Sequence, residues 1–284
     1  MIIQKFLTFL VILILFSGNA FTENADRKNR DINLNGLIEI PTARIAGNQI
    51  FRWITNIIGF QNKDPLIFMT YGQSNSVNQS EKGYETVEDV YMFLDGRTYK
   101  YQDPALGGTG GNGSVWGRVG DQLIQNNITN KVVFVNTGWS GASIHNLTYN
   151  HQYVFFEEQL KSVLETFGRI DGILFHQGET NHQRQSGSDG YNNDFLTLLT
   201  NIRKLTDAPV YLSQVSLCQS KSDKTLLQIQ DTLIKKNKGI FRGPNSDILS
   251  DPKFRLPDYC HFSVEGLNEL SKMWYQSIVN KSEI

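Results

Sequence analysis

PLIFMTYGQSNSVN, the stretch from Pro65 to Asn78, decides the fold. It begins with a short apolar run and stops at Gly72-Gln73-Ser74-Asn75. An apolar run that ends in glycine and small polar residues is typical of a buried strand that leads into a loop. Ser74 is therefore a candidate nucleophile at the end of a strand. Read alone, these four residues favour an ordinary turn, so the assignment depends on partners elsewhere in the chain.

Predicted strands and helices alternate along the rest of the chain. Strands are expected at Leu66 to Met69, Val90 to Leu94, Val132 to Val135, Gly172 to Phe175, Pro209 to Val215 and, weakly, Gly239 to Arg242. Helices are expected at Val115 to Gln125, Tyr153 to Phe167, Tyr191 to Leu205, Lys224 to Lys236 and Ser263 to Val279. This alternation predicts an α/β fold in which a parallel sheet carries helices on both faces.

Polar loops follow the predicted strands, among them Asn136 to Ser143 and His176 to Glu179. Ligands of such sheets bind at the carboxyl ends of the strands, so these loops and Ser74 are expected at one edge. The glycine-rich stretch Gly107 to Gly113 lacks the preceding strand and the following acidic residue that a dinucleotide-binding loop requires. It is interpreted as a flexible loop at the rim.

A serine nucleophile needs a base, and the chain has 5 histidines. His261 lies in PDYCHF, just before the last predicted helix, with Asp258 three residues upstream. This spacing lets one turn present a carboxylate to the imidazole. The alternatives are a surface or helix-capping histidine and an aspartate that only stabilises a turn. His145, His151 and His182 are assigned to polar loops as surface residues.

Two rival sites are poorly supported. The α/β-hydrolase motif Gly-x-Ser-x-Gly fails because Ser76 stands at its second glycine, and because Asp258 and His261 share one loop. His176 and Glu179 are close in sequence, but neither a His-Glu-x-x-His helix nor a cysteine cluster is present, so no metal site is expected.

The composition is that of a globular protein, with 39% hydrophobic and 19% charged residues and a net charge of -1. This balance does not favour nucleic acid or an anionic membrane as a partner. Lys5 followed by the apolar residues 6–16 and by small residues predicts a signal peptide at 1–20 and hence export to the periplasm or the medium. A polar lead-in is expected at 21–36, a single domain at 37–284, and no stable membrane insertion of the mature chain.

Four blocks carry a family resemblance: GQSN at Gly72 to Asn75, GASI at Gly141 to Ile144, FHQGE at Phe175 to Glu179 and DYCHF at Asp258 to Phe262. Their residues and order resemble the SGNH hydrolases, in particular the sialate O-acetylesterase and acetylxylan esterase branch. The resemblance implies a three-layer α/β/α sandwich with a flavodoxin-like parallel sheet. It also implies esterase activity without a cofactor.

The resemblance also implies a role for each matching residue. Ser74 matches the nucleophile, His261 the base and Asp258 the residue that orients the base. The amides of Ser74 and Gly141 match oxyanion donors, and Gln177 matches the side-chain donor that other members supply as asparagine.

Further residues are expected to support the site. Gln73, Asn75 and Glu179 are assigned to supporting or substrate contacts, and for Glu179 both ordering the loop and contacting substrate stay open. The loop aromatics can stack on sugars or simply pack; they are Tyr71, Trp139, Tyr149 and Tyr259. The chain departs from the family at Gly138-Trp139-Ser140 and at Thr180-Asn181-His182, where relatives carry adjacent glycines and an acidic residue, respectively.

The positions of the only two cysteines concern the candidate base, His261. Cys260 adjoins His261, and Cys218 follows the strand at Pro209 to Val215 on the edge where the site opens. Because export permits disulfides, a bond between them is predicted to fix the His261 loop, and two free thiols are the alternative.

The leading hypothesis is an exported O-acetylesterase that acts on an acetylated carbohydrate through Ser74, His261 and Asp258. The alternatives are a lipid or general short-chain ester hydrolase and a non-catalytic glycan-binding domain. The sequence does not indicate which glycan is the substrate or what the oligomeric state is.

Overall fold

The computed structural model describes residues 65–183 and 190–280, all within a unit that runs from Gly36 to Ile284. The expected signal peptide and polar lead-in lie outside the described residues. None of the helices in the described part has the length and apolar character needed to cross a membrane.

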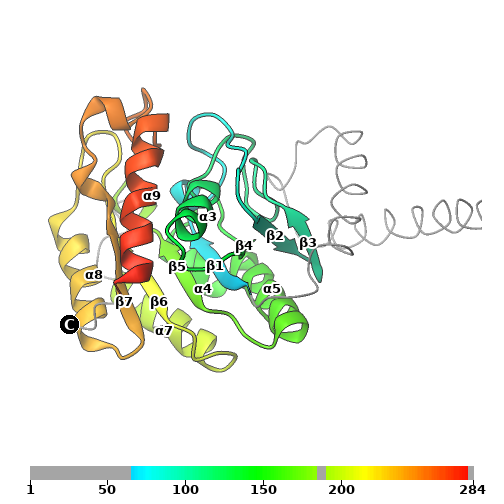
Figure 1. The fold of residues 1–284 in the computed structure, drawn as a ribbon. Helices are drawn as coiled ribbons and strands as arrows, with labels where there is room; N and C mark the ends of the chain where they lie inside the picture. The colour runs from blue at the N-terminus through cyan, green and yellow to red at the C-terminus, as the bar shows by residue number, and fades with distance from the viewer. Residues whose placement is uncertain (1–64, 184–189, 281–284) are drawn as a thin grey trace, which may run out of the picture. The chain divides into compact units, whose positions relative to one another are not determined.

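A seven-stranded sheet forms the centre of the domain (Figure 1). Its strands are β1 (Leu66–Gly72), β2 (Val90–Leu94), β3 (Arg97–Lys100), β4 (Val132–Asn136), β5 (Gly172–His176), β6 (Val210–Gln214) and β7 (Ile240–Asn245). They lie in the order β3-β2-β4-β1-β5-β6-β7, and every pair except β2 and β3 is parallel. After β1 the chain forms β2, β3 and β4 on one side of β1 and then crosses to β5 on the other side. Such a reversal of strand order is where α/β sheets bind ligands.

The predicted α/β fold is confirmed, with one correction at the edge of the sheet. β3 was not predicted, and it pairs with β2 in antiparallel register, Leu94 opposite Arg97. The two residues between them, Asp95 and Gly96, both have positive φ angles, 49° and 76°. A two-residue Asp-Gly loop is a strong hairpin signal, because both of its positions must tolerate left-handed backbone.

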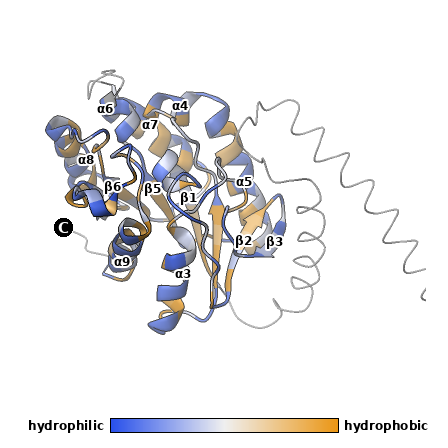
Figure 2. Ribbon diagram, turned by 90° about the horizontal axis from the view of Figure 1, so that it is seen from above, coloured by the Kyte–Doolittle hydropathy of each residue, from blue (hydrophilic) through white to orange (hydrophobic). Residues whose placement is uncertain are grey.

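Helices cover both faces of the sheet, which gives the three layers (Figure 2). α3 (Trp116–Gln125) and α9 (Val264–Val279) lie on one face. The other face carries α4 (Ile144–Tyr149), α5 (His151–Phe167), α7 (Tyr191–Arg203) and α8 (Lys224–Lys236). A short helix, α6 (Glu179–Gln183), follows β5.

Three of the histidines that were assigned to polar loops lie in helices. His145 lies in α4, His151 begins α5 and His182 lies in α6, so their assignment to loops was wrong. The start of α4 has a sequence signal, because Ser143 and Asn146 form a capping box in which each side chain accepts a hydrogen bond from the other residue's backbone amide.

Large aromatic side chains fill the layer between the sheet and the α3–α9 pair. Trp116 of α3 lies 5.2 Å from Trp274 of α9 and 5.9 Å from Phe134 of β4, measured between ring centroids. All three rings are fully buried. Burial of such rings is among the largest favourable contributions to folding, and it fixes α9 against the sheet.

The glycine-rich stretch is packed, not free. The side-chain amide of Asn78 donates hydrogen bonds to the carbonyls of Ala105 and Gly108, and the amide of Thr109 donates to the carbonyl of Gly138. The stretch therefore connects the loop after β1 with the loop after β4, contrary to the expected flexible rim.

Candidate active site

The backbone at the end of β1 presents Ser74. Ser74 begins a 3-10 helix, η1 (Ser74–Ser76), and is 5% exposed. Gly72 has a φ angle of 144°, and a Cβ atom there would lie 2.0 Å from the carbonyl oxygen of His176. Only glycine permits the strand to turn this close to β5.

Gln73 fastens this turn to the loop after β5. Its side-chain oxygen accepts hydrogen bonds from the amides of Gly178 and Thr180, at 3.2 and 2.9 Å, and from the side-chain amide of Gln177 at 3.2 Å. Gln73 therefore acts as a support, because its acceptor is fully occupied by protein groups.

His261 and Asp258 form the pair that their spacing predicts. His261 Nδ1 lies 2.5 Å from Asp258 Oδ2, while Asp258 Oδ1 accepts hydrogen bonds from the amides of Cys260 and His261. A carboxylate only accepts, so Nδ1 carries the proton and Nε2 is the basic atom of the neutral ring. Nε2 is buried and has no hydrogen-bond partner among the described residues.

The electrostatics keep Asp258 ionised. Partial burial acts to raise the pKa of this carboxyl, but the hydrogen bonds from Cys260 and His261 and the nearby imidazole outweigh it and lower the pKa below its ordinary value. The carboxylate therefore holds the tautomer in which Nε2 can accept a proton.

Direct contacts join the loops of Ser74 and His261. Asn75 Nδ2 donates a 3.1 Å hydrogen bond to the carbonyl of Cys260, and the amide of Glu81 donates one of 2.9 Å to the carbonyl of Phe262. The hydroxyl of Ser74 and the imidazole of His261 are not hydrogen-bonded to each other. Catalytic hydrogen bonds are often long or misaligned in the absence of substrate.

A disulfide and a set of arginine hydrogen bonds hold the His261 loop from its other side. Cys218 and Cys260 form a disulfide. The buried guanidinium of Arg255 donates to the carbonyls of Cys260, Leu249 and Ser246, at 2.6, 2.8 and 2.8 Å. Sequence reasoning missed Arg255, because an arginine five residues before a cysteine carries no recognisable motif.

Two backbone amides are available at this edge. The amides of Ser74 and Gly141 make no hydrogen bonds within the described part of the chain, and Gly141 has a φ angle of 68°. The neighbouring amide of Ser140 donates to Thr109 Oγ1 at 2.6 Å, which fixes the loop after β4. Thr109 is a further supporting residue that the sequence reasoning did not single out.

Gln177 has other partners in this structure. Its buried Nε2 donates to Asn181 Oδ1 at 2.6 Å, to Gln73 Oε1 at 3.2 Å and to the carbonyl of Ala142 at 3.3 Å. The side chain thus connects the loops after β1, β4 and β5. Its role as an oxyanion donor stays a prediction.

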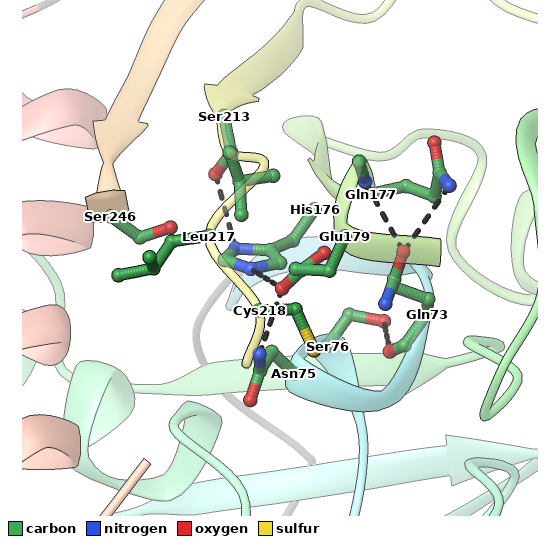
Figure 3. Close-up of polar contacts among 12 residues, drawn as sticks. Gln73, Asn75, Ser76, His176, Gln177, Glu179, Ser213, Leu217, Cys218 and Ser246 are labelled. Carbon is green, nitrogen blue, oxygen red and sulfur yellow. Dashed lines mark hydrogen bonds and ion pairs between the residues drawn. The ribbon is translucent and has the colours of Figure 1, made fainter. Parts of the chain in front are cut away.

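Glu179 is fully buried and lies next to Asn75, the residue after Ser74 (Figure 3). Its Oε1 accepts a hydrogen bond of 2.8 Å from Asn75 Nδ2 and lies 3.2 Å from His176 Nε2. Burial alone would raise the pKa of this carboxyl, but the charge and hydrogen bond of His176 and the hydrogen bond of Asn75 lower it overall. Glu179 is therefore an ionised carboxylate in the interior.

The loop aromatics differ in exposure. Tyr71 and Trp139 are buried and pack inside the domain. Tyr149 and Tyr259 are 50% and 43% exposed, so these two alone of the four present a large open face. Tyr259 lies between Asp258 and His261 in sequence.

The sheet order and the helices on both faces are those of the SGNH hydrolase fold. The chain belongs to the carbohydrate esterase family described as sialic acid-specific acetylesterases, whose model matches residues 111–280. The matched range includes Gly141, Gln177, Asp258 and His261 and begins after Ser74. A comparison with curated proteins finds no match.

Solved structures share the fold at low sequence identity. A protein of Arabidopsis thaliana has a TM-score of 0.61 and 14% identity over 77% of this chain and 99% of its own. An acetyl xylan esterase of Geobacillus stearothermophilus has a TM-score of 0.52 and 15% identity over 77% and 96%. The psychrotrophic esterase EstA of a Pseudoalteromonas species has a TM-score of 0.51 and 12% identity over 75% and 97%.

Proposed function

We propose that this carbohydrate esterase removes acetyl groups from a sugar or polysaccharide through an acyl-enzyme formed on Ser74. The observation that carries the proposal is the His261–Asp258 pair, in which Nε2 of His261 has no hydrogen-bond partner among the described residues. The loop of this pair is joined to the residue after Ser74 by the hydrogen bond from Asn75 to the carbonyl of Cys260. A hydroxyl is a weak nucleophile without such a base.

The reaction has two halves. Ser74 Oγ attacks the acetyl carbonyl while His261 Nε2 takes its proton, and the amides of Ser74 and Gly141 stabilise the negative charge that develops on the carbonyl oxygen. His261 then returns the proton to the departing sugar oxygen. Water attacks the acetyl-enzyme with His261 again as base, which releases acetate and restores the serine.

Replacement of the nucleophile tests this mechanism. Ser74→Ala is expected to lower acetate release from an acetylated sugar, and turnover of p-nitrophenyl acetate, by at least about 10³-fold, because the acyl-enzyme no longer forms. Circular dichroism should report an unchanged fold.

The matched control is Ser80→Ala. The hydroxyl of Ser80 is buried and has no hydrogen-bond partner among the described residues, so this variant should retain activity. Undiminished turnover in Ser74→Ala would refute the mechanism. Binding of acetylated glycan by the wild type without acetate release would instead favour a glycan-binding domain, and preference for octanoyl over acetyl esters would favour a lipid esterase.

We also propose that the protein is exported. Two independent features support this: the charged and apolar pattern of residues 1–20, and the Cys218–Cys260 disulfide, since structural disulfides form in oxidising compartments.

A further inference from the structure

A buried polar network connects the HQGE segment to both halves of the proposed catalytic site. Glu179 Oε1 accepts from Asn75 Nδ2, and the same amide nitrogen donates to the carbonyl of Cys260, at 2.8 and 3.1 Å. Asn75 directly follows Ser74, and Cys260 directly precedes His261. One side-chain amide therefore connects the element of the nucleophile to the loop of the base.

The network fixes which way the Asn75 amide points. Both partners of its nitrogen are acceptors, so exchanging its nitrogen and oxygen would bring oxygen against oxygen at two places. On the far side of Glu179, His176 Nε2 lies 3.2 Å from Oε1, and His176 Nδ1 lies 3.3 Å from the hydroxyl of Ser213 (Figure 3). The imidazole thereby holds the carboxylate that orients the amide.

A role for Glu179 in folding alone does not account for this arrangement. Gln73 already binds the amides of Gly178 and Thr180 around the start of α6. Among the described residues, the only backbone amide that contributes to the carboxylate's pKa is that of Glu179 itself, so capping of the helix is a minor part of its role. A buried carboxylate paired with a histidine adds little net stability, because it loses its hydration. What the pair supplies is a fixed position for Asn75.

Arg255 does not substitute for this connection. Its guanidinium also donates to the carbonyl of Cys260, but its other acceptors, Leu249 and Ser246, belong to the same C-terminal part of the chain. Arg255 therefore orders the His261 loop internally, whereas Asn75 connects that loop to Ser74.

We propose that Glu179, held by His176, is a positioning residue that sets the placement of His261 relative to Ser74 through the Asn75 side chain. This inference rests on the proposed function, since it assumes that Ser74 and His261 react together. Because Glu179 is fully buried against Asn75 and His176, its loss should lower kcat and leave KM nearly unchanged.

Two substitutions at this position separate geometry from charge. Glu179→Leu keeps the approximate volume but removes the acceptor, and it is expected to lower kcat for p-nitrophenyl acetate between about tenfold and 10²-fold, because small displacements of reacting groups have effects of this size. Glu179→Gln keeps a neutral acceptor at Oε1 and should lower kcat by only about threefold, since hydrogen bonds to an ionised acceptor are the stronger ones.

Combination with Asn75→Ala tests whether Glu179 acts through Asn75. If it does, Glu179→Leu should lower kcat no further in the Asn75→Ala background. Gln159→Leu is the matched control: Gln159 is also buried and bonds Asp95 at the β2–β3 turn, so its loss should reduce the melting temperature without changing kcat.

The outcomes are distinct. Additive losses in the double variant, a rise in KM with kcat unchanged, or failure of Glu179→Gln to restore kcat would each overturn the positioning role. If Glu179→Leu does not fold, the kcat values of Glu179→Gln and Asn75→Ala are compared instead. A positioning role through Asn75 requires that Asn75→Ala lower kcat more than Glu179→Gln does. Full activity of Ser74→Ala would instead contradict the proposed function itself.

Discussion

At the scale of single residues, Gly72 shows how closely the site depends on backbone geometry. Its carbonyl accepts a hydrogen bond from the amide of Trp139, and the amide of Gln73 donates to His176. The end of β1 is thereby fastened to the segments on both sides of it. A side chain at this position has no room, which makes Gly72 a sensitive point for the placement of Ser74.

Gly72→Ala is expected to destabilise the protein by at least about 1–3 kcal/mol and to lower kcat, because the new Cβ meets backbone atoms of His176 and the φ angle of 144° is strained for alanine. Denaturant unfolding and p-nitrophenyl acetate turnover measure the two effects. Gly111→Ala serves as the control, since a Cβ at Gly111 meets nothing within 4 Å. Equal stability of the two variants would contradict the close packing at Gly72.

At the scale of elements, the disulfide joins the segment after β6 to the loop that precedes α9. The segment that leads to Cys218 is itself fixed, because Asp247 accepts hydrogen bonds from the amides of Ser216 and Leu217, at 2.8 and 2.9 Å. The bond therefore fastens the His261 loop to a segment that is itself anchored.

The double variant Cys218→Ser/Cys260→Ser is expected to lose about 4 kcal/mol of unfolding free energy, the loop-closure value for cysteines with a sequence separation of 42. Denaturant unfolding, with the reduced wild type for comparison, measures the loss. Activity should fall at temperatures where the oxidised wild type is still fully active. A reduced protein as stable as the oxidised one would argue that Arg255 and Asn75 suffice to hold the loop.

Elements with strong periodic or apolar patterns could be predicted from the sequence, whereas contacts between loops could not. The helix at Lys224 to Lys236 was predicted with its observed bounds, and all six predicted strands overlap observed strands. β3 was missed, although Asp95-Gly96 signals a hairpin, because four residues with little apolar content do not read as a strand. Gln177 and Glu179 were identified by motif, but their partners depend on which loops the sheet brings together.

At the scale of the whole molecule, the sheet order brings separate blocks of sequence to one edge. The loops after β4, β1 and β5, three adjacent strands, contribute Gly141, Ser74 and Gln177. The His261 loop reaches the same edge because α9 packs on the sheet through Trp274. The family model identifies the chain as a carbohydrate esterase, and the fold brings the family's sequence blocks together.

Export is a property of the whole chain and is tested on the full-length protein. Residues 1–20 should be removed, so that the chain recovered from the periplasm or the medium begins near Phe21, with Cys218 and Cys260 oxidised. N-terminal sequencing and non-reducing mass spectrometry measure this. Recovery of an unprocessed, reduced chain from the cytoplasm would contradict export.

The central position of β1 also determines how local motions are distributed. A strand paired on both sides opens only when its neighbours open, so we expect slow amide exchange in the backbone leading to Ser74 and faster exchange in the edge strands β3 and β7. The base, by contrast, sits on a loop outside the sheet. We therefore expect thermal fluctuations that change the distance between nucleophile and base to arise mainly on the side of His261, where the Asn75 amide and the disulfide restrain the loop.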